Sequence, residues 1–268
     1  MAIIKSPAEI ELMAEAGRRL GEILAILAAE VRPGLETAFF DEKSSALIKK
    51  AGCEPAFLNY RPTGAKKGYP ATICVSVNDV IVHGAPSGYV IKDGDLAKLD
   101  LGLIWKGWYA DAAVTVCALR QSSGQAVRQG SPQTGKIDPL KKRLIETTRE
   151  ALRLGIAAAQ PGNTIGDIGF AIENHVRAQG CSVADGLTGH GISRELHEEP
   201  YVYNFGKKGQ GETLKPGMVI AIEPMVVAGS GKVKQLNDDS YATADGSLAA
   251  HFEHTVAVTE KGPRVLTR

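Results

Sequence analysis

The stretch that decides the fold of this chain is DLAKLDLGLIWKGWYADAAVTVCA, residues 95–118. Apolar residues dominate on both sides of Lys106-Gly107, a dipeptide suited to a tight turn, and Trp105 and Trp108 flank it. A two-residue turn between apolar runs predicts a β-hairpin.

This hairpin carries two acidic residues. If Trp105 pairs with Trp108, Asp100 lies opposite Ala113, and Asp111 becomes the diagonal neighbour of Asp100 on the same face. Diagonal neighbours lie about 7–8 Å apart at Cα. Carboxylates at that spacing can reach inward and share two metal ions roughly 3.5–4 Å apart.

Five potential metal ligands lie in segments that we expect to be buried strands or strand ends. They are Asp100, Asp111, His190, Glu223 and Glu253. An ionised carboxylate in an apolar strand is costly unless a positive group faces it. Four such carboxylates, without a matching number of buried Lys or Arg residues, predict a bound cation and favour two. For any single Asp, a place at the exposed end of a strand is an equal alternative.

The chemistry of this set is hard and rich in oxygen, which favours Mn, Fe, Co or Zn over softer metals. Structural zinc instead takes Cys and His in a closed tetrahedron, and the four cysteines here form no CxxC pair. Two ions bridged by carboxylates can activate water at neutral pH and polarise a carbonyl. The set therefore indicates metal-assisted hydrolysis.

Two histidines of the segment GHGISRELHEEP receive different roles. His190 and His197 are seven positions apart, which is not the i, i+4 spacing of a helical metal-binding pair. We expect His190 to be a ligand and His197 to lie unligated near the substrate. Taken alone, each histidine is more often structural than catalytic.

Two further histidines, His251 and His254, flank Glu253. We interpret both as structural rather than metal-binding histidines, and we expect their side chains to point away from the face that Glu253 occupies.

Helices and loops surround these segments. Ser6, Pro7 and Glu9 form the pattern of a capping box, which predicts a helix to about Glu30. Further helices are expected at about 38–50, 139–159 and 165–178, and two short strands within 71–83 with a turn at Asn78-Asp79. Residues 120–137 are polar and aperiodic, so we expect a mobile surface insertion there.

The chain contains an internal repeat. Pro33-Gly34, a helix and Gly52 match Pro161-Gly162, a helix and Gly180, while IKDGDLAKLDLG (91–102) matches LKPGMVIAIEPM (214–225). One domain, 1–268, with pseudo-symmetric halves of about 1–118 and 139–268 is therefore expected. Asp100 and Glu223 would come from equivalent strands and meet between the halves, a common place for active sites.

The composition is that of a soluble globular protein. The chain has 268 residues, 44% of them hydrophobic, and a net charge of +1, which gives no overall attraction to nucleic acid or anionic membranes. It shows no signal peptide pattern and no apolar run long enough to span a membrane. Four scattered cysteines are expected to be free thiols in a reducing compartment, so the expected location is the cytoplasm.

Taken together, the motifs resemble a known family. YPATICVSVNDVIVHGAP, the Asp100/Asp111 hairpin, GHGISRELHEEP, AIEPMV and HFEHTVAVTE follow the order of the methionine aminopeptidases. The resemblance implies the pita-bread fold, an α/β (α+β) class in which helix–strand units repeat about a pseudo-twofold axis around a central antiparallel sheet. The short spacing between His197 and Glu223, and the lack of a zinc-binding extension, resemble the type I bacterial short form.

The resemblance also implies roles for individual residues. Asp111 and Glu253 would bridge two divalent ions (Co, Mn, Fe or Zn), Asp100 would complete one site, and His190 and Glu223 would complete the other. Glu223 would double as the general acid–base, His83 and His197 would bind the scissile amide and the tetrahedral intermediate, and Tyr69 and Cys74 would line the methionine pocket.

The activity implied is removal of the N-terminal methionine from nascent proteins and peptides that have a small second residue. A metal-activated water would attack the scissile carbonyl. The expected partners are nascent polypeptide N-termini, met at the ribosome, and the enzyme is expected to be a monomer that binds no specific nucleic acid and no membrane.

This chain departs from the family pattern at a few positions. Lys98 shares a strand face with Asp100, where a small polar residue is common, and a cation there would weaken metal binding. Gly102 and Ala112-Ala113 replace residues that often carry hydroxyl groups. Where the family often has a pocket Trp, the stretch 236–246 offers Tyr241.

Two rival interpretations remain. A prolidase, aminopeptidase P or creatinase-like hydrolase would share the fold, but the first two usually carry a further N-terminal domain, and only about 70 residues precede the first motif strand here. Creatinase-like enzymes lack the full ligand set. A non-catalytic binding protein would have lost ligands, and none is lost.

Overall fold

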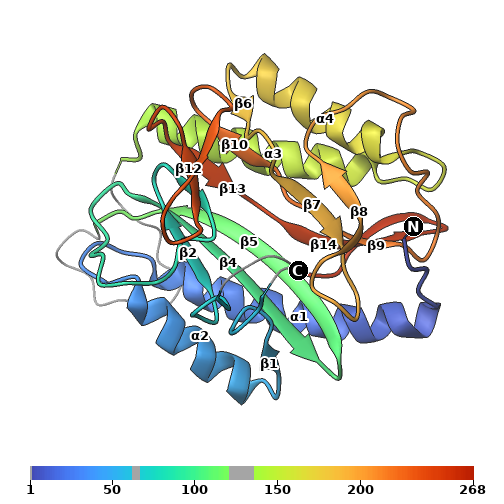
Figure 1. Ribbon diagram of the computed structural model, residues 1–268, viewed down its shortest axis with the longest axis horizontal. Helices are drawn as coiled ribbons and strands as arrows, with labels where there is room; N and C mark the ends of the chain where they lie inside the picture. The colour runs from blue at the N-terminus through green and yellow to red at the C-terminus, as the bar shows by residue number, and fades with distance from the viewer. Residues whose placement is uncertain (1, 62–66, 121–135) are drawn as a thin grey trace.

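A computed structural model describes residues 2–61, 67–120 and 136–268. Two helix pairs enclose antiparallel sheets (Figure 1). The first pair is α1 (Pro7–Glu30) and α2 (Ala38–Lys50), and the second is α3 (Pro139–Ala158) and α4 (Ile165–Ala178). Nearly all of the insertion expected at 120–137 lies outside the described residues.

The start of α1 confirms the predicted capping box. Ser6 Oγ accepts a hydrogen bond from the Glu9 amide at 3.4 Å, and the Ser6 amide donates to Glu9 Oε2 at 2.8 Å. These bonds satisfy amides that have no partner within the helix. The helix then buries an apolar face that includes Met13, Leu20 and Leu27, and it packs on the predicted hairpin.

Two larger sheets and two small ones make up the β-structure, and all their pairings are antiparallel. The first larger sheet contains β1 (Glu54–Pro55), β2 (Cys74–Val77), β4 (Leu96–Trp105) and β5 (Trp108–Cys117). The second has the order β15 (Gly262–Val265), β14 (His254–Thr259), β9 (Val219–Ile222), β7 (Thr188–Gly191) and β8 (Glu198–Tyr203). The small sheets are β13 (Ala249–His251), β10 (Met225–Val227) and β6 (Ser182–Val183), and β11 (Val233–Gln235), β12 (Tyr241–Thr243) and β3 (Val80–Val82).

The hairpin of β4 and β5 has the predicted register. Trp105 pairs with Trp108, and Asp100 lies opposite Ala113. Both turn residues have positive φ, +51° at Lys106 and +74° at Gly107, as a tight turn between twisted strands requires.

The internal repeat is also visible in the backbone. Each half begins with two helices (Figure 1). Later in each half comes a strand with an acidic residue: β4 contains Asp100, and β9 ends just before Glu223. Three pairs of matching glycines have similar positive φ values: Gly34 and Gly162 (+93° and +89°), Gly52 and Gly180 (+67° and +70°), and Gly94 and Gly217 (+84° and +94°). Equivalent left-handed positions in both halves support the pseudo-twofold arrangement.

The two halves meet along a seam between β5 and residues 251–255. Thr115 Oγ1 donates to the His251 carbonyl at 2.7 Å and accepts from its amide at 2.9 Å. Two residues further along each segment, the Glu253 amide donates to the Ala113 carbonyl at 3.0 Å. The seam therefore has a fixed antiparallel register, in which a threonine hydroxyl replaces some main-chain partners.

The same seam continues for two more residues. Thr255 Oγ1 donates to the Asp111 carbonyl at 2.8 Å and accepts from the Asp111 amide at 3.0 Å. Both residues are buried. The register of this seam is what brings a carboxylate of one half beside a carboxylate of the other.

Candidate metal centre

The strand registers place the acidic residues in one row across the sheet. Cys74 of β2 pairs with Asp100 of β4, which pairs with Ala113 of β5, and Ala113 is bonded to Glu253 across the seam. Ala113 is the smallest side chain that an L-residue can place between the two carboxylates. The row therefore leaves space between Asp100 and Glu253.

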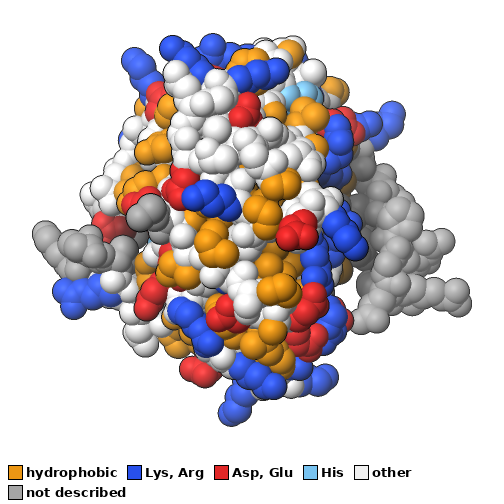
Figure 2. Space-filling model, turned by 90° about the vertical axis from the view of Figure 1, so that its right-hand side faces the viewer, with side chains coloured by type: hydrophobic (Ala, Val, Ile, Leu, Met, Phe, Trp, Pro, Cys, Tyr) orange, Lys and Arg blue, Asp and Glu red, His pale blue; other side chains and the backbone are white. Residues whose placement is uncertain are grey.

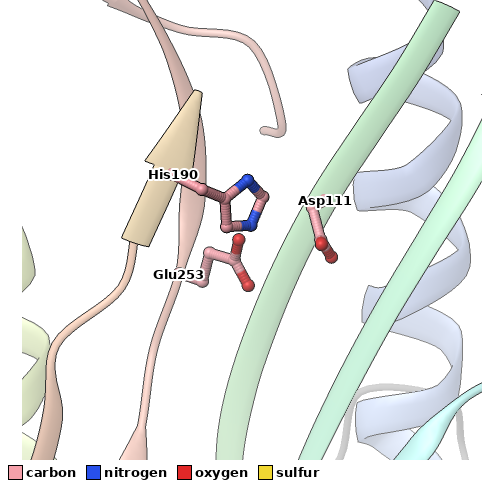
Figure 3. A group of neighbouring side chains, drawn as sticks. All are labelled: Asp111, His190 and Glu253. Atoms are coloured by element: carbon pink, nitrogen blue, oxygen red, sulfur yellow. The ribbon is translucent and has the colours of Figure 1, made fainter. Parts of the chain in front are cut away.

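Three of the five predicted ligands converge from opposite sides of this space. Asp111 reaches from β5, and His190 and Glu253 reach toward it from the facing segments (Figure 3). Ligand atoms of the three lie within 4.8 Å of one another. His190 Nε2 also lies 3.6 Å from Glu223 Oε1, so the fourth predicted ligand belongs to the same cluster.

Asp100 is the fifth predicted ligand. It is not part of either compact three-residue group of possible ligands in the described chain. Its carboxyl nevertheless interacts with that of Asp111, as the predicted diagonal relation requires.

The ring of His190 is oriented for metal binding. His190 lies on β7, which pairs with β9, the strand that ends just before Glu223. The Nδ1 atom of His190 lies 2.9 Å from the Gly191 carbonyl. A carbonyl can only accept, so Nδ1 carries the proton and the lone pair of Nε2 is free for a cation.

The raised pKa values of the four carboxyl groups indicate that a cation is needed to keep them ionised. Burial raises the pKa of Asp100 to about 7 and that of Glu223 to about 7. Burial also raises the pKa of Asp111 and of Glu253 well above the usual range, and the neighbouring carboxylates act in the same direction. Desolvation disfavours these anions, and its effect on Asp100 and Glu223 exceeds the opposite effect of the neighbouring histidines.

Unpartnered oxygens indicate the same need. Asp100 Oδ1, Asp111 Oδ1 and Glu253 Oε1 are buried and have no hydrogen-bond partner among the described residues. Buried oxygens of this kind are normally satisfied. Carboxylates with free lone pairs beside an imidazole are a donor set that fits divalent transition metals, so the residues present fit a bound metal.

His251 corrects the sequence-based expectation. Instead of pointing away, its Nε2 lies 3.3 Å from Glu223 Oε2 and 3.9 Å from Glu253 Oε2. The reason is that residues two apart along an extended chain share a face, so His251 and Glu253 point the same way. The two hydrogen bonds between Thr115 Oγ1 and the main chain of His251 keep this segment extended beside β5. Burial lowers the pKa of His251 to about 4, so its ring is neutral.

His254 does point away, as expected. Its Nδ1 lies 2.9 Å from Thr267 Oγ1 rather than beside the carboxylates. Burial lowers its pKa to about 4.

His83 and His197 lie at the rim of the cluster. The ring of His197 contacts that of His190, with centroids 4.3 Å apart, and the ring of His83 packs edge-on against Tyr241 at 5.7 Å. Both side chains reach solvent, and partial desolvation of the rings lowers the pKa of His83 and of His197 from that of a free imidazole. Both rings are therefore neutral and able to offer an N–H.

Tyr60 is a site residue that the sequence analysis missed. Its hydroxyl lies 2.6 Å from His197 Nδ1, and the two rings are 5.1 Å apart. The residues are 137 positions apart, and no motif links them, so no sequence signal identifies the contact.

Tyr69 and Cys74 lie beside the row of carboxylates. Cys74 is the direct neighbour of Asp100. Tyr69 donates to the carbonyls of Ile73 and Gly84 at 3.2 and 3.1 Å. Both belong to an apolar cluster that includes Phe57, Tyr60 and Leu196, the kind of surface that a thioether side chain can pack on.

The departures at 98 and 102 have structural counterparts. Lys98 is 1% exposed, and its ammonium donates to the carbonyls of Asn78 at 2.7 Å and Ala249 at 3.4 Å. It is thus held by main-chain oxygens rather than by Asp100. At Gly102, an added Cβ would lie 2.6 Å from the ring of Phe57, so aromatic packing takes the place of a hydroxyl-bearing side chain.

Among the described residues, no helix has both the length and the apolar character needed to cross a membrane.

Comparison with known proteins agrees with this geometry. The model of metallopeptidase family M24 matches residues 11–260. A methionine aminopeptidase of Clostridium perfringens is 41% identical over 268 residues, covering 100% of this chain and 99% of the relative. Methionine aminopeptidase 1 of Bacillus subtilis is 39% identical and is covered completely.

Solved structures show the same relationship. A methionine aminopeptidase of Thermotoga maritima superposes with a TM-score of 0.89 at 37% identity, over 100% of both chains. A prolidase of Pyrococcus furiosus, at 24% identity and a TM-score of 0.72, is covered over 66% of its chain and shares the fold alone. The fold is the mixed α/β pita-bread fold, and the chain belongs to metallopeptidase family M24 and, within it, to the methionine aminopeptidases.

Proposed function

We propose that this protein is a metal-dependent aminopeptidase that removes the N-terminal methionine from polypeptides with a small second residue. The observation that carries the proposal is the buried cluster of Asp111, His190 and Glu253 in a chain that aligns over its full length with methionine aminopeptidases. The cluster supplies the hydrolytic chemistry, and the relatives supply the substrate class.

Two divalent ions (Co, Mn, Fe or Zn) fit the donor set. Asp111 and Glu253 would bridge them, Asp100 would complete one site, and His190 and Glu223 would complete the other. When bound, such ions polarise a carbonyl and lower the pKa of water toward neutrality.

The chain's own residues would then position and protonate the substrate. Glu223 would take the proton of the attacking water and return it to the leaving amine. The neutral rings of His83 and His197 would donate N–H groups to the scissile amide and to the oxygen that becomes negative during attack. These three are the proposed catalytic residues.

The position of Asp100 explains why the enzyme would act only at chain ends. The free α-amine of the substrate would lie beside Asp100, while the methionine side chain would contact Cys74, which pairs with Asp100, and Tyr69, which belongs to the same apolar cluster as Cys74. A polypeptide without a free amino terminus would lack the first of these contacts.

The natural setting proposed is the cytoplasm, where a monomer would act on nascent chains at the ribosome. Four free cysteines suit a reducing compartment. On the face shown in Figure 2, acidic and basic side chains are interspersed rather than gathered by sign, and a net charge of +1 gives no general affinity for nucleic acid. The single domain of two pseudo-symmetric halves, about 1–118 and 139–268, belongs to the same proposal.

The test uses Glu223→Gln and two peptides. The wild-type protein should release Met from Met-Ala-Ser in the presence of Mn or Co and should not cleave Xaa-Pro. Glu223→Gln should lower turnover by roughly 10²–10⁴-fold because it removes the proton carrier. Cleavage of Xaa-Pro instead of Met-Ala-Ser would contradict the substrate, and near-normal turnover by Glu223→Gln would contradict its role.

A further inference from the structure

We propose that His251 is a metal ligand, so that the centre contains two imidazoles, those of His190 and His251. This inference rests on the dinuclear centre proposed above and adds a ligand that the family resemblance did not assign. The ligand atoms of Glu223, His251 and Glu253 lie within 4.8 Å of one another and form a second compact group beside that of Asp111 and His190.

The distances fit ligands of a single ion. His251 Nε2 lies 3.3 Å from Glu223 Oε2 and 3.9 Å from Glu253 Oε2. Ligand atoms about 2.1 Å from one tetrahedral ion are about 3.4 Å apart. The observed separations lie close to this value, and only small side-chain movements would close the longer one.

The imidazole of His251 has no other partner. The residue is 1% exposed, and neither Nδ1 nor Nε2 makes a hydrogen bond among the described residues. A buried structural histidine normally satisfies its ring nitrogens. His254 shows the ordinary pattern, because its Nδ1 is held by Thr267.

The position of His251 is fixed by its main chain. Its amide and its carbonyl are both bonded to Thr115 Oγ1 on β5. The ring is therefore aimed at Glu223 and Glu253 by a rigid seam, as a metal ligand requires.

A second imidazole would change the metal preference. Imidazole suits Co, Zn and Fe, whereas a set of carboxylates alone suits Mn and Mg. Divalent Co already binds sites of nitrogen and oxygen ligands more tightly than Mn, and His251 would increase this preference at the ion beside Glu223 and Glu253.

The experiment counts metal-bound imidazoles in the cobalt-loaded protein. In proton NMR of the Co(II) form, each ligating histidine gives one solvent-exchangeable N–H resonance shifted far downfield by the paramagnetic ion. The expected result is two such resonances in the wild-type protein, one in His251→Gln, and two in the matched control His254→Gln. The wild-type spectrum with ¹⁵N-labelled histidine, in which each such proton is split by its nitrogen, makes the count independent of how well the variants fold.

Calorimetric titration with Co and Mn gives a second readout that does not depend on activity. His251→Gln should lose at least tenfold in Co affinity relative to Mn, whereas His254→Gln should not change the ratio. A single shifted resonance in the wild-type protein that persists in His251→Gln and disappears in His190→Gln would overturn the role of His251 and leave the proposed function intact. Failure of the wild-type protein to bind cobalt would overturn both.

Discussion

The seam between the two halves leads to a sharp prediction at Thr255. Its hydroxyl donates to the Asp111 carbonyl at 2.8 Å and accepts from the Asp111 amide at 3.0 Å, at a residue that is 0% exposed. Thr255→Val keeps the shape and removes both bonds. Each buried main-chain group left without a partner costs about 1–3 kcal/mol, so the free energy of unfolding should fall by about 2–6 kcal/mol.

The assay is urea unfolding of the metal-free protein, followed by calorimetric titration with Mn. The control is Thr259→Val. The hydroxyl of Thr259 also makes two main-chain hydrogen bonds, donating to the Gly262 carbonyl and accepting from the Lys261 amide, but these lie in a hairpin turn that is partly open to water. It should cost less than about 1 kcal/mol, since water can replace the lost bonds. Mn affinity should fall in Thr255→Val alone, because Asp111 loses its anchor. Equal losses of stability in the two variants would refute the role of the seam.

Three further predictions concern the site itself. Ala113→Leu should abolish metal binding by filling the space between two carboxylates, whereas Ala113→Ser should retain it; measured metal content that is equal in both would contradict the row geometry. Tyr60→Phe should lower kcat by up to about tenfold, because it removes one hydrogen bond to His197, and it should not change the metal content. An unchanged kcat would show that this bond does not orient the ring of His197. Asp100 and Glu223 have pKa values raised to about 7 in the metal-free protein, so both carboxyls hold protons below pH 7. A metal must displace these protons to bind. Metal affinity should therefore rise with pH up to about 7, by about tenfold per pH unit for each proton released. Calorimetry in buffers of different ionisation enthalpy measures that release, and an affinity that does not change from pH 5.5 to 7 would contradict it.

The parts of the fold that were predictable depend on local signals. The Lys106-Gly107 turn sets the register of its hairpin, because two flanking strands can pair in only one way around a two-residue turn. The capping box at Ser6 and Glu9 sets the start of α1 in the same local manner. The diagonal position of Asp111 beside Asp100 follows directly from the hairpin register.

The parts that could not be predicted depend on contacts between distant segments. The seam joins Thr115 to His251 across 136 positions, and a threonine that bonds a distant main chain has no distinguishing pattern in sequence. The orientation of His251 was therefore predicted wrongly, and Tyr60 was not identified. The ammonium of Lys98 could be placed on the correct face, but its attachment to the carbonyls of Asn78 and Ala249 depends on how another small sheet packs there.

The most direct test is a crystal structure of the protein grown with manganese, with diffraction data collected at the manganese absorption edge. The anomalous difference map should show two peaks that both contact Glu253, one of them bounded by Asp111 and His190. A map without a peak between β5 and Glu253 would contradict the proposal that the two halves of the chain meet around a pair of metal ions.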